Sequence, residues 1–221
     1  MGYFQRDYFE GLGDKMRIII DGACGSGKTT FLTEIKNRIT EKHISNIQVF
    51  NELIKGSINE GRNQEICPPK NDSDWEKLFT LVLDRGISQY ENSAFNGIAW
   101  LDRGLPFLNV FAKEHDKKLP DEMIHKIMKY RYDVVFLFEP IPSLDLSTVD
   151  NGKFRLFSLD ERRASYEMTY KEYQKSGHRV YRLPYYSNDT HYDFFMKLNA
   201  ISKTLHCDFN TDISILKEFD M

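Results

Sequence analysis

The stretch Gly22-Ala-Cys-Gly-Ser-Gly-Lys-Thr29 matches the pattern G-x-x-x-x-G-K-[ST]. A short apolar run, residues 16–21, precedes it and favours a β-strand. Residues 30–39 follow it, and their apolar side chains recur at the spacing of a helix. A strand, a glycine-rich loop and a helix in this order are the context of a phosphate-binding loop. The alternative is a chance match in an ordinary turn, which the two flanking elements disfavour.

The residue types of this loop suit the binding of nucleotide phosphates. Glycines permit tight turns that bring backbone N–H groups close to phosphate oxygens, and the following helix directs its positive end to the same place. Lys28 can reach the outer phosphates, and the Thr29 hydroxyl can ligate Mg²⁺. The residues that we expect to bind the nucleotide are Gly22, Ala23, Cys24, Gly25, Ser26, Gly27, Lys28, Thr29 and Thr30.

Two acidic residues stand at the ends of predicted strands. Glu52 closely follows one apolar run, and Asp102 ends another and is followed by Arg103. Parallel α/β sheets bind ligands at the carboxyl edge of their strands. We therefore expect Asp102 to hold Mg²⁺ together with Thr29, and Arg103 to bind a phosphate or a carboxylate. The alternatives are a solvated glutamate and an ordinary polar turn.

A basic segment follows the fourth predicted strand. Residues 153–163 contain four cations, of which Arg155, Arg162 and Arg163 are our candidates for neutralising phosphate charge. The alternative is the start of a solvated helix, which acidic residues at 160 and 161 would favour. Residues 56–73, rich in glycine, asparagine and proline, indicate a long loop or a mobile cover over a site.

Length and composition set limits on the class of protein. The chain has 221 residues and a formal net charge of −3, which suits one domain and gives no reason to expect nucleic acid as a partner. Its three cysteines are far apart and lack metal-ligand spacing, which argues against a disulfide framework. The chain shows no signal peptide and no apolar membrane span, so we expect a cytoplasmic protein. The sequence does not determine the oligomeric state, and a homodimer is one of the alternatives.

Strands and helices alternate along the chain. Strands are predicted over residues 16–21, 46–50, 97–102, 133–138 and 179–183. Helices are predicted over residues 30–39, 75–90, 105–115, 120–130, 164–175 and 192–205. This alternation predicts an α/β fold with a five-stranded parallel sheet that is flanked by helices and joined by right-handed crossovers. We divide the chain into an extension (1–15), a kinase-like domain (16–205) and a tail (206–221).

The order of these motifs resembles a known family, the small P-loop kinase-like ATPases typified by the ribosylnicotinamide kinase domain of bacterial NAD-metabolism regulators. The resemblance covers about residues 16–205, and the phosphate-binding loop is its most specific part. The other matches are short, and they are Glu52, Asp102, Asp133-Val-Val-Phe-Leu-Phe138, Asp150-Asn-Gly-Lys-Phe-Arg155 and Asp160-Glu-Arg-Arg163. The resemblance does not extend to the DNA-binding and adenylyltransferase parts of the regulators. It implies a P-loop NTPase fold of the nucleoside/nucleotide-kinase type, with the five-stranded parallel sheet in the order 2-3-1-4-5.

Together these features predict a kinase that uses ATP and Mg²⁺ to phosphorylate a small acceptor, such as a nucleoside or a nucleotide. Lys28 would be the main phosphate-binding cation, and Glu52 or Asp102 would position or deprotonate the acceptor. The arginines at 103, 155, 162 and 163 would neutralise charge. The alternative is a P-loop ATPase or nucleotide switch that acts on a protein partner. The choice between ATP and GTP is left open.

Overall fold

Five parallel strands form one sheet in the computed structural model, which describes residues 15–93, 97–143 and 158–217. The strands are β1 (Met16–Gly22), β2 (Ile47–Phe50), β3 (Ile98–Asp102), β4 (Val134–Phe138) and β5 (Val180–Leu183). Their order, β2-β3-β1-β4-β5, confirms the predicted P-loop fold class. Consecutive strands are joined by helices, as parallel pairing requires.

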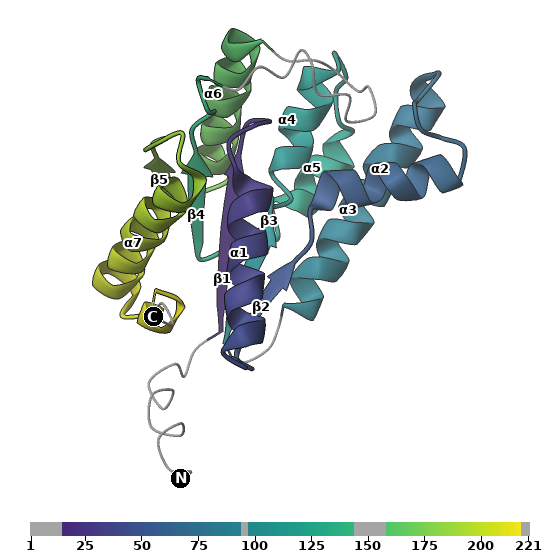
Figure 1. The fold of residues 1–221 in the computed structure, drawn as a ribbon. Coiled ribbons are helices and arrows are strands. Elements are labelled where there is room, and N and C mark those ends of the chain that lie inside the picture. The colour runs from purple at the N-terminus through teal and green to yellow at the C-terminus, as the bar shows by residue number, and fades with distance from the viewer. Residues whose placement is uncertain (1–14, 94–96, 144–157, 218–221) are drawn as a thin grey trace.

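Helices cover both faces of this sheet (Figure 1). They are α1 (Lys28–Glu41), α2 (Leu53–Asn63), α3 (Asp72–Asn92), α4 (Phe107–Glu114), α5 (Asp121–Ile127), α6 (Leu159–Lys175) and α7 (Thr190–Phe209), followed by the short 3₁₀ helix η1 (Ser214–Leu216). Helices α1 and α7 pack on one face, and α3 and α6 contribute to the core on the other. A further apolar core lies between α2, α3, α4 and α5.

The central strand β1 is buried along its whole length. Ile18 and Ile20 point into the core beneath α1 and α7, whereas Ile19 points into the core on the opposite face. Apolar residues on both faces are what the middle of a parallel sheet requires. The register pairs Ile20 with Asp102 on β3, so the carboxyl ends of β1 and β3 lie at one edge of the sheet.

The prediction of a loop over residues 56–73 is wrong for its first part, because α2 runs from Leu53 to Asn63. Helix α2 is stabilised by packing against α3, and Gly56 allows close approach between the two. A Cβ atom at Gly56 would lie 2.4 Å from the guanidinium carbon of Arg85. Tertiary burial therefore outweighs the low helix propensity of glycine here.

Two further helix ends differ from the predicted ones by at least four residues. Helix α6 begins at Leu159, five residues earlier than expected, because Ser158 and Glu161 form a capping box at its start. At the other end of the chain, α7 extends to Phe209, and Ile213 and Leu216 are buried in the core. Part of the predicted tail thus belongs to the packed body of the protein.

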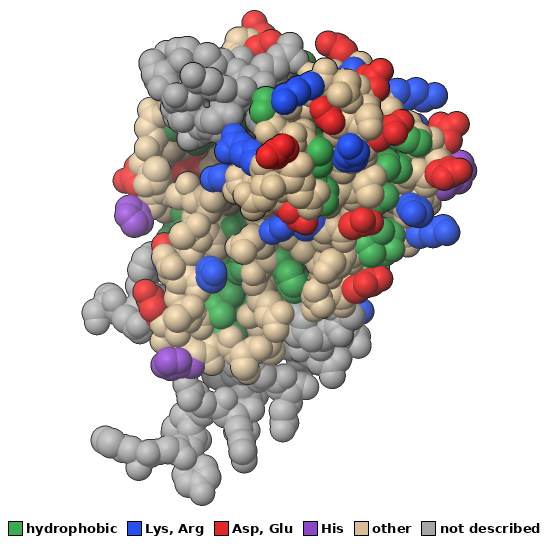
Figure 2. Space-filling view, turned by 90° about the vertical axis from the view of Figure 1, so that its right-hand side faces the viewer, with side chains coloured by type: hydrophobic (Ala, Val, Ile, Leu, Met, Phe, Trp, Pro, Cys, Tyr) green, Lys and Arg blue, Asp and Glu red, His purple; other side chains and the backbone are tan. Residues whose placement is uncertain are grey.

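The surface of the protein carries both acidic and basic side chains. Figure 2 shows basic and acidic side chains intermingled over one side of the protein. Ion pairs between segments include Arg85 on α3 with Glu60 on α2, at 4.0 Å, and Lys117, between α4 and α5, with Asp72 on α3, at 2.7 Å. Among the helices of the described residues, none combines the length and the apolar character needed to cross a membrane.

Candidate active site

The glycine-rich loop joins β1 to α1 through left-handed backbone positions. Gly22, Gly25 and Gly27 have φ angles of 145°, 69° and 83°, which residues other than glycine rarely adopt. At Gly22 a Cβ atom would also lie 2.3 Å from the Phe138 carbonyl oxygen on β4. Of the other residues predicted to bind the nucleotide, Ala23, Ser26 and Lys28 are buried, whereas Cys24, Thr29 and Thr30 are exposed.

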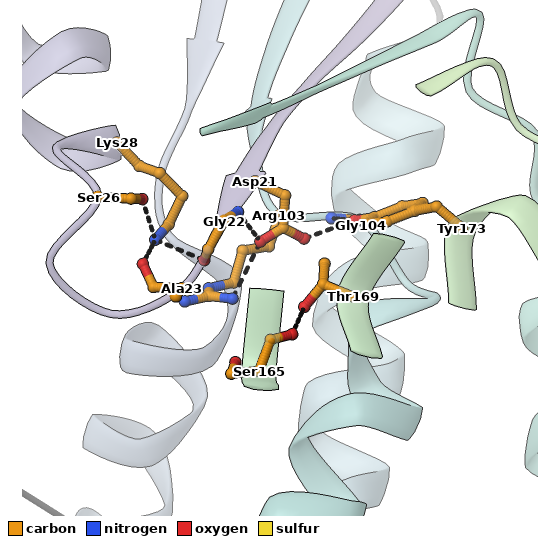
Figure 3. A network of polar contacts seen from close by, with 10 residues as sticks. All are labelled: Asp21, Gly22, Ala23, Ser26, Lys28, Arg103, Gly104, Ser165, Thr169 and Tyr173. Atoms are coloured by element: carbon orange, nitrogen blue, oxygen red, sulfur yellow. Dashed lines mark hydrogen bonds and ion pairs between the residues drawn. The ribbon is translucent and has the colours of Figure 1, made fainter. Parts of the chain in front are cut away.

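The side chain of Lys28 lies across the inside of this loop (Figure 3). Its Nζ atom donates to the carbonyl oxygens of Gly22 and Ala23, both at 2.9 Å, and to Ser26 Oγ at 3.4 Å. Burial lowers the pKa of Lys28, and the nearby Arg103 guanidinium lowers it further. This ammonium is desolvated, and among the described residues its acceptors within hydrogen-bond distance are all neutral. A phosphate oxygen would therefore be a stronger partner for it.

A buried polar network connects the ends of β1 and β3 beneath the loop (Figure 3). Asp21 Oδ1 accepts hydrogen bonds from the Gly22 N–H at 2.7 Å and from Arg103 Nη1 at 3.0 Å. Asp21 Oδ2 accepts from the Tyr173 hydroxyl at 2.7 Å, and that hydroxyl accepts from the Gly104 N–H at 2.8 Å. The network therefore fixes the first residue of the loop relative to β3 and α6.

Arg103, which we predicted to bind phosphate or carboxylate, belongs to this network. Its guanidinium pairs with Asp21 and lies 3.7 Å from the centre of the Phe107 ring. Burial disfavours its charge, but the carboxylates of Asp21, Glu52 and Asp102 outweigh burial and raise the pKa of Arg103. The structure thus brings Arg103 to the predicted edge, and contact with a ligand stays a prediction.

Asp102 is a buried carboxyl group at the same edge. Its Oδ1 atom has no hydrogen-bond partner among the described residues, although the residue is only 2 % exposed. Burial raises the pKa of Asp102 to about 6, even though Lys28 and Arg103 act in the opposite direction. Glu52, at the start of α2, is close enough to raise it further. Together with Asp21, five charged side chains from the ends of three strands and from the loop therefore converge here.

The residues present suit a magnesium ion bound together with nucleotide phosphates. Mg²⁺ in such sites uses one or two carboxylates plus phosphate oxygens and water. The unpartnered oxygen of Asp102 offers one such carboxylate, and Thr29 in the first turn of α1 offers a hydroxyl. Within the described part of the chain, no group of three or more His, Cys, Asp or Glu residues could hold a metal by itself.

The predicted basic segment is only partly described. Arg155 lies outside the described residues. Arg162 is buried on α6 and donates from Nη1 to the carbonyl oxygen of Ile141 at 3.1 Å. Arg163 is exposed and lies 3.8 Å from Asp160 on the same helix. The roles of all three arginines in binding phosphate stay predictions.

Sequence reasoning missed three functional candidates that the fold brings to the loop: Asp21, Tyr173 and Lys197. Lys197 on α7 is 1 % exposed, and its Nζ lies 2.7 Å from Asp193 Oδ2 and 3.4 Å from the Ser26 carbonyl oxygen. Asp21 could have been found by the argument used for Asp102, because it also stands at the end of a strand. The sequence offers no comparable signal for Tyr173 or Lys197.

A cavity of about 330 Å³ lies beside the outer end of the loop. Its walls come from the first turns of α1 and α7, and they are formed by Thr29, Thr30, Thr33, Glu34, Thr190, His191 and Phe194. Thr29 and Thr30 belong both to these walls and to the loop, so a ligand held by its phosphates at the loop would have its remaining part within reach of this cavity.

The left-handed glycine loop, its buried lysine and the strand order together define a P-loop domain with a kinase-like fold. The family described as an AAA domain (AAA_28) matches residues 17–190. The chain therefore belongs to this family.

Solved structures show the same fold at low sequence identity. Thymidylate kinase from Ehrlichia chaffeensis is 14% identical with a TM-score of 0.54, and the match covers 85% of this chain and 98% of that one. Deoxyadenosine kinase from M. mycoides, with dCMP and dCDP bound, is 16% identical with a TM-score of 0.58. The match covers 85% of this chain and 100% of that one. NadR protein in complex with NR is 20% identical with a TM-score of 0.55. The match covers 86% of this chain and 51% of that one. No curated protein matches the chain.

Proposed function

We propose that this protein transfers the γ-phosphoryl group of ATP to a small acceptor, with a nucleoside or a nucleotide as the acceptor class. The observation that carries the proposal is the convergence of Lys28, Asp102 and Glu52 beside the phosphate-binding loop. A phosphoryl-transfer site needs a cation for the phosphates, a carboxylate for the metal and a group that orients the nucleophile. These three side chains meet that need.

Each residue has a distinct role in this proposal. The backbone N–H groups of the loop and Lys28 bind the β- and γ-phosphates. Thr29 and Asp102 would hold Mg²⁺, which when bound neutralises charge on the phosphate oxygens. With a hydroxyl as the acceptor group, Glu52 accepts its proton, because Asp102 is engaged in holding the metal. Catalysis then rests on positioning and electrostatics, without a covalent intermediate.

The neighbouring structures support the choice of acceptor. Two of the solved proteins with this fold are described as a thymidylate kinase and a deoxyadenosine kinase, and a third is described as a complex with NR. Their low identity shows a common fold only, so the acceptor class is our inference for this chain.

The test is ADP production from Mg-ATP, measured alone and with a panel of nucleosides, ribosylnicotinamide and nucleoside monophosphates. We expect turnover that depends on one class of acceptor and that is lost in the Lys28→Ala variant. Thermal shift with Mg-ATP reports binding separately from turnover. Slow turnover that is the same with every acceptor would contradict the proposal and favour an ATPase that acts on a protein partner.

A further inference from the structure

Lys197 occupies a position that is costly for a lysine. It lies in the middle of α7, is 1 % exposed, and its Nζ is 4.5 Å from the centre of the Phe138 ring. Burial lowers the pKa of Lys197, whereas Asp193 and Glu139 act to keep it charged. A buried ammonium of this kind is retained only where its partners compensate for its lost hydration. Those partners include the backbone of the phosphate-binding loop.

The contact with the loop is made to one particular peptide group. Lys197 Nζ lies 3.4 Å from the carbonyl oxygen of Ser26, and it would lie 3.8 Å from a Cβ atom on Gly27. A trans peptide is planar, and its C=O and N–H point in opposite directions. Because the Ser26 carbonyl faces α7, the N–H group of Gly27 points away from α7.

The preceding peptide of the loop is held from outside in a similar way. The N–H group of Ile141, just after β4, donates to the Gly25 carbonyl oxygen at 3.1 Å. Two successive carbonyl groups of the loop therefore have donors outside the loop. With their carbonyls fixed, the N–H groups of these peptides are set in orientation before any ligand arrives.

Asp193 holds the ammonium of Lys197 in place. Its Oδ2 atom lies 2.7 Å from Lys197 Nζ, and its Oδ1 atom accepts from the N–H of Tyr186 at 3.0 Å. Since both carboxylate oxygens are engaged, the Asp193 side chain is anchored at the segment between β5 and α7. Asp193 and Lys197 are one helical turn apart, so α7 presents them as a unit.

We propose that Lys197 is a positioning residue, which holds the Ser26–Gly27 peptide so that the Gly27 N–H can donate to a phosphate oxygen. This inference rests on the proposed nucleotide binding, and it adds α7 as an element on which phosphate affinity depends. A hydrogen bond to the carbonyl also polarises the peptide, which strengthens its N–H as a donor.

A purely structural role for Lys197 makes a different prediction. Loss of packing around α7 would disturb the cavity wall formed by Thr190, His191 and Phe194 as much as the loop. Tripolyphosphate carries the phosphates without the nucleoside, so it reports on the loop alone. Comparing Mg-ATP with Mg-tripolyphosphate separates the two roles.

The experiment is isothermal titration calorimetry of both ligands with the full chain and with Lys197→Met. We expect Lys197→Met to raise both dissociation constants by the same factor, about tenfold, which corresponds to about 1.4 kcal/mol. Asp193→Asn should also raise both dissociation constants, by a smaller factor. If Lys197→Met does not fold, the test is made with Asp193→Asn. Arg17→Met is the matched control, because Arg17 is a buried cation at the opposite end of β1 that bonds to Ser93. It should lower the melting temperature and leave both affinities unchanged.

The possible results distinguish the inference from the function on which it rests. Variants that bind both ligands as the wild type does, or that lose affinity for Mg-ATP alone, would overturn the role of Lys197. A wild-type protein that binds neither ligand would overturn the proposed function, and the inference with it.

Discussion

Arg103 Nη1 lies 3.0 Å from Asp21 Oδ1, in a buried ion pair that joins the carboxyl ends of β3 and β1. The same oxygen of Asp21 accepts from the Gly22 N–H, so the pair also fixes the first residue of the phosphate-binding loop. Arg103 has a φ angle of 72°, in the left-handed region. The site thus combines an unfavourable backbone conformation with a buried ion pair, and the pair must hold that conformation.

Removing one partner of this ion pair should destabilise the whole protein. Arg103→Met leaves the Asp21 carboxylate buried without its cation, and such a loss costs about 3–5 kcal/mol. We expect the free energy of unfolding in urea to fall by about that amount. Arg163→Met is the matched control, because Arg163 is exposed and its loss should change stability by less than about 0.5 kcal/mol. Equal stability of the two variants would show that the ion pair contributes nothing.

The Tyr173 hydroxyl is the second support of this network. Tyr173→Phe leaves Asp21 Oδ2 and the Gly104 N–H without their partner, both in a buried place. An unsatisfied buried polar group costs about 1–3 kcal/mol, so we expect a loss of that size in the free energy of unfolding. Tyr170→Phe is the control, because the Tyr170 hydroxyl bonds only to exposed Gln174 among the described residues. A Tyr173→Phe variant no less stable than this control would contradict the assignment.

Asp102 should link stability to pH. Its pKa is about 6 in the folded protein against an ordinary value of 3.8, so the folded state holds a proton that the unfolded chain releases. Stability should therefore fall as the pH rises from about 4 to about 6, by about 3 kcal/mol in total. Asp102→Asn removes this ionisation, so we expect the ligand-free variant to be more stable than the wild type at neutral pH and equally stable below about pH 4.

The same substitution should abolish magnesium-dependent nucleotide binding, because an amide offers the cation no charge. Melting temperatures recorded from pH 4 to pH 8, with and without Mg-ATP, give both results on one sample series. Glu76→Gln is a control for the loss of a carboxylate outside the site, because Glu76 is exposed on α3. An Asp102→Asn variant that is less stable than the wild type at neutral pH would contradict the prediction.

Glu52 tests the nature of the acceptor. If Glu52 accepts a hydroxyl proton, Glu52→Gln should lower kcat by about 10²- to 10⁴-fold, because that is the usual contribution of a general base. The affinity for Mg-ATP should change little, since the loop and Lys28 are untouched. The measurement is kcat and KM for both substrates. Full turnover in this variant would point to a phosphate acceptor, which needs no base.

The sequence by itself determined the fold class and predicted the place of the candidate site. The loop from Gly22 to Thr29 is read from local spacing, and the strands from the periodicity of apolar residues. The strand order was predicted with the family resemblance, whereas general rules for α/β sheets bring Glu52 and Asp102 to one edge. Signals of this kind lie within a few neighbouring residues, so they survive in the sequence alone.

Only the tertiary structure decided which side chains hold the loop in position. Asp21 and Arg103 are 82 residues apart, and Tyr173 is 152 residues from Asp21. Lys197 is 171 residues from Ser26. Contacts over such separations leave no periodic pattern in the chain, because each depends on how the packed helices meet the sheet. For the same reason the burial of Ile213 and Leu216 was visible only once α7 was placed against α1 and the strands.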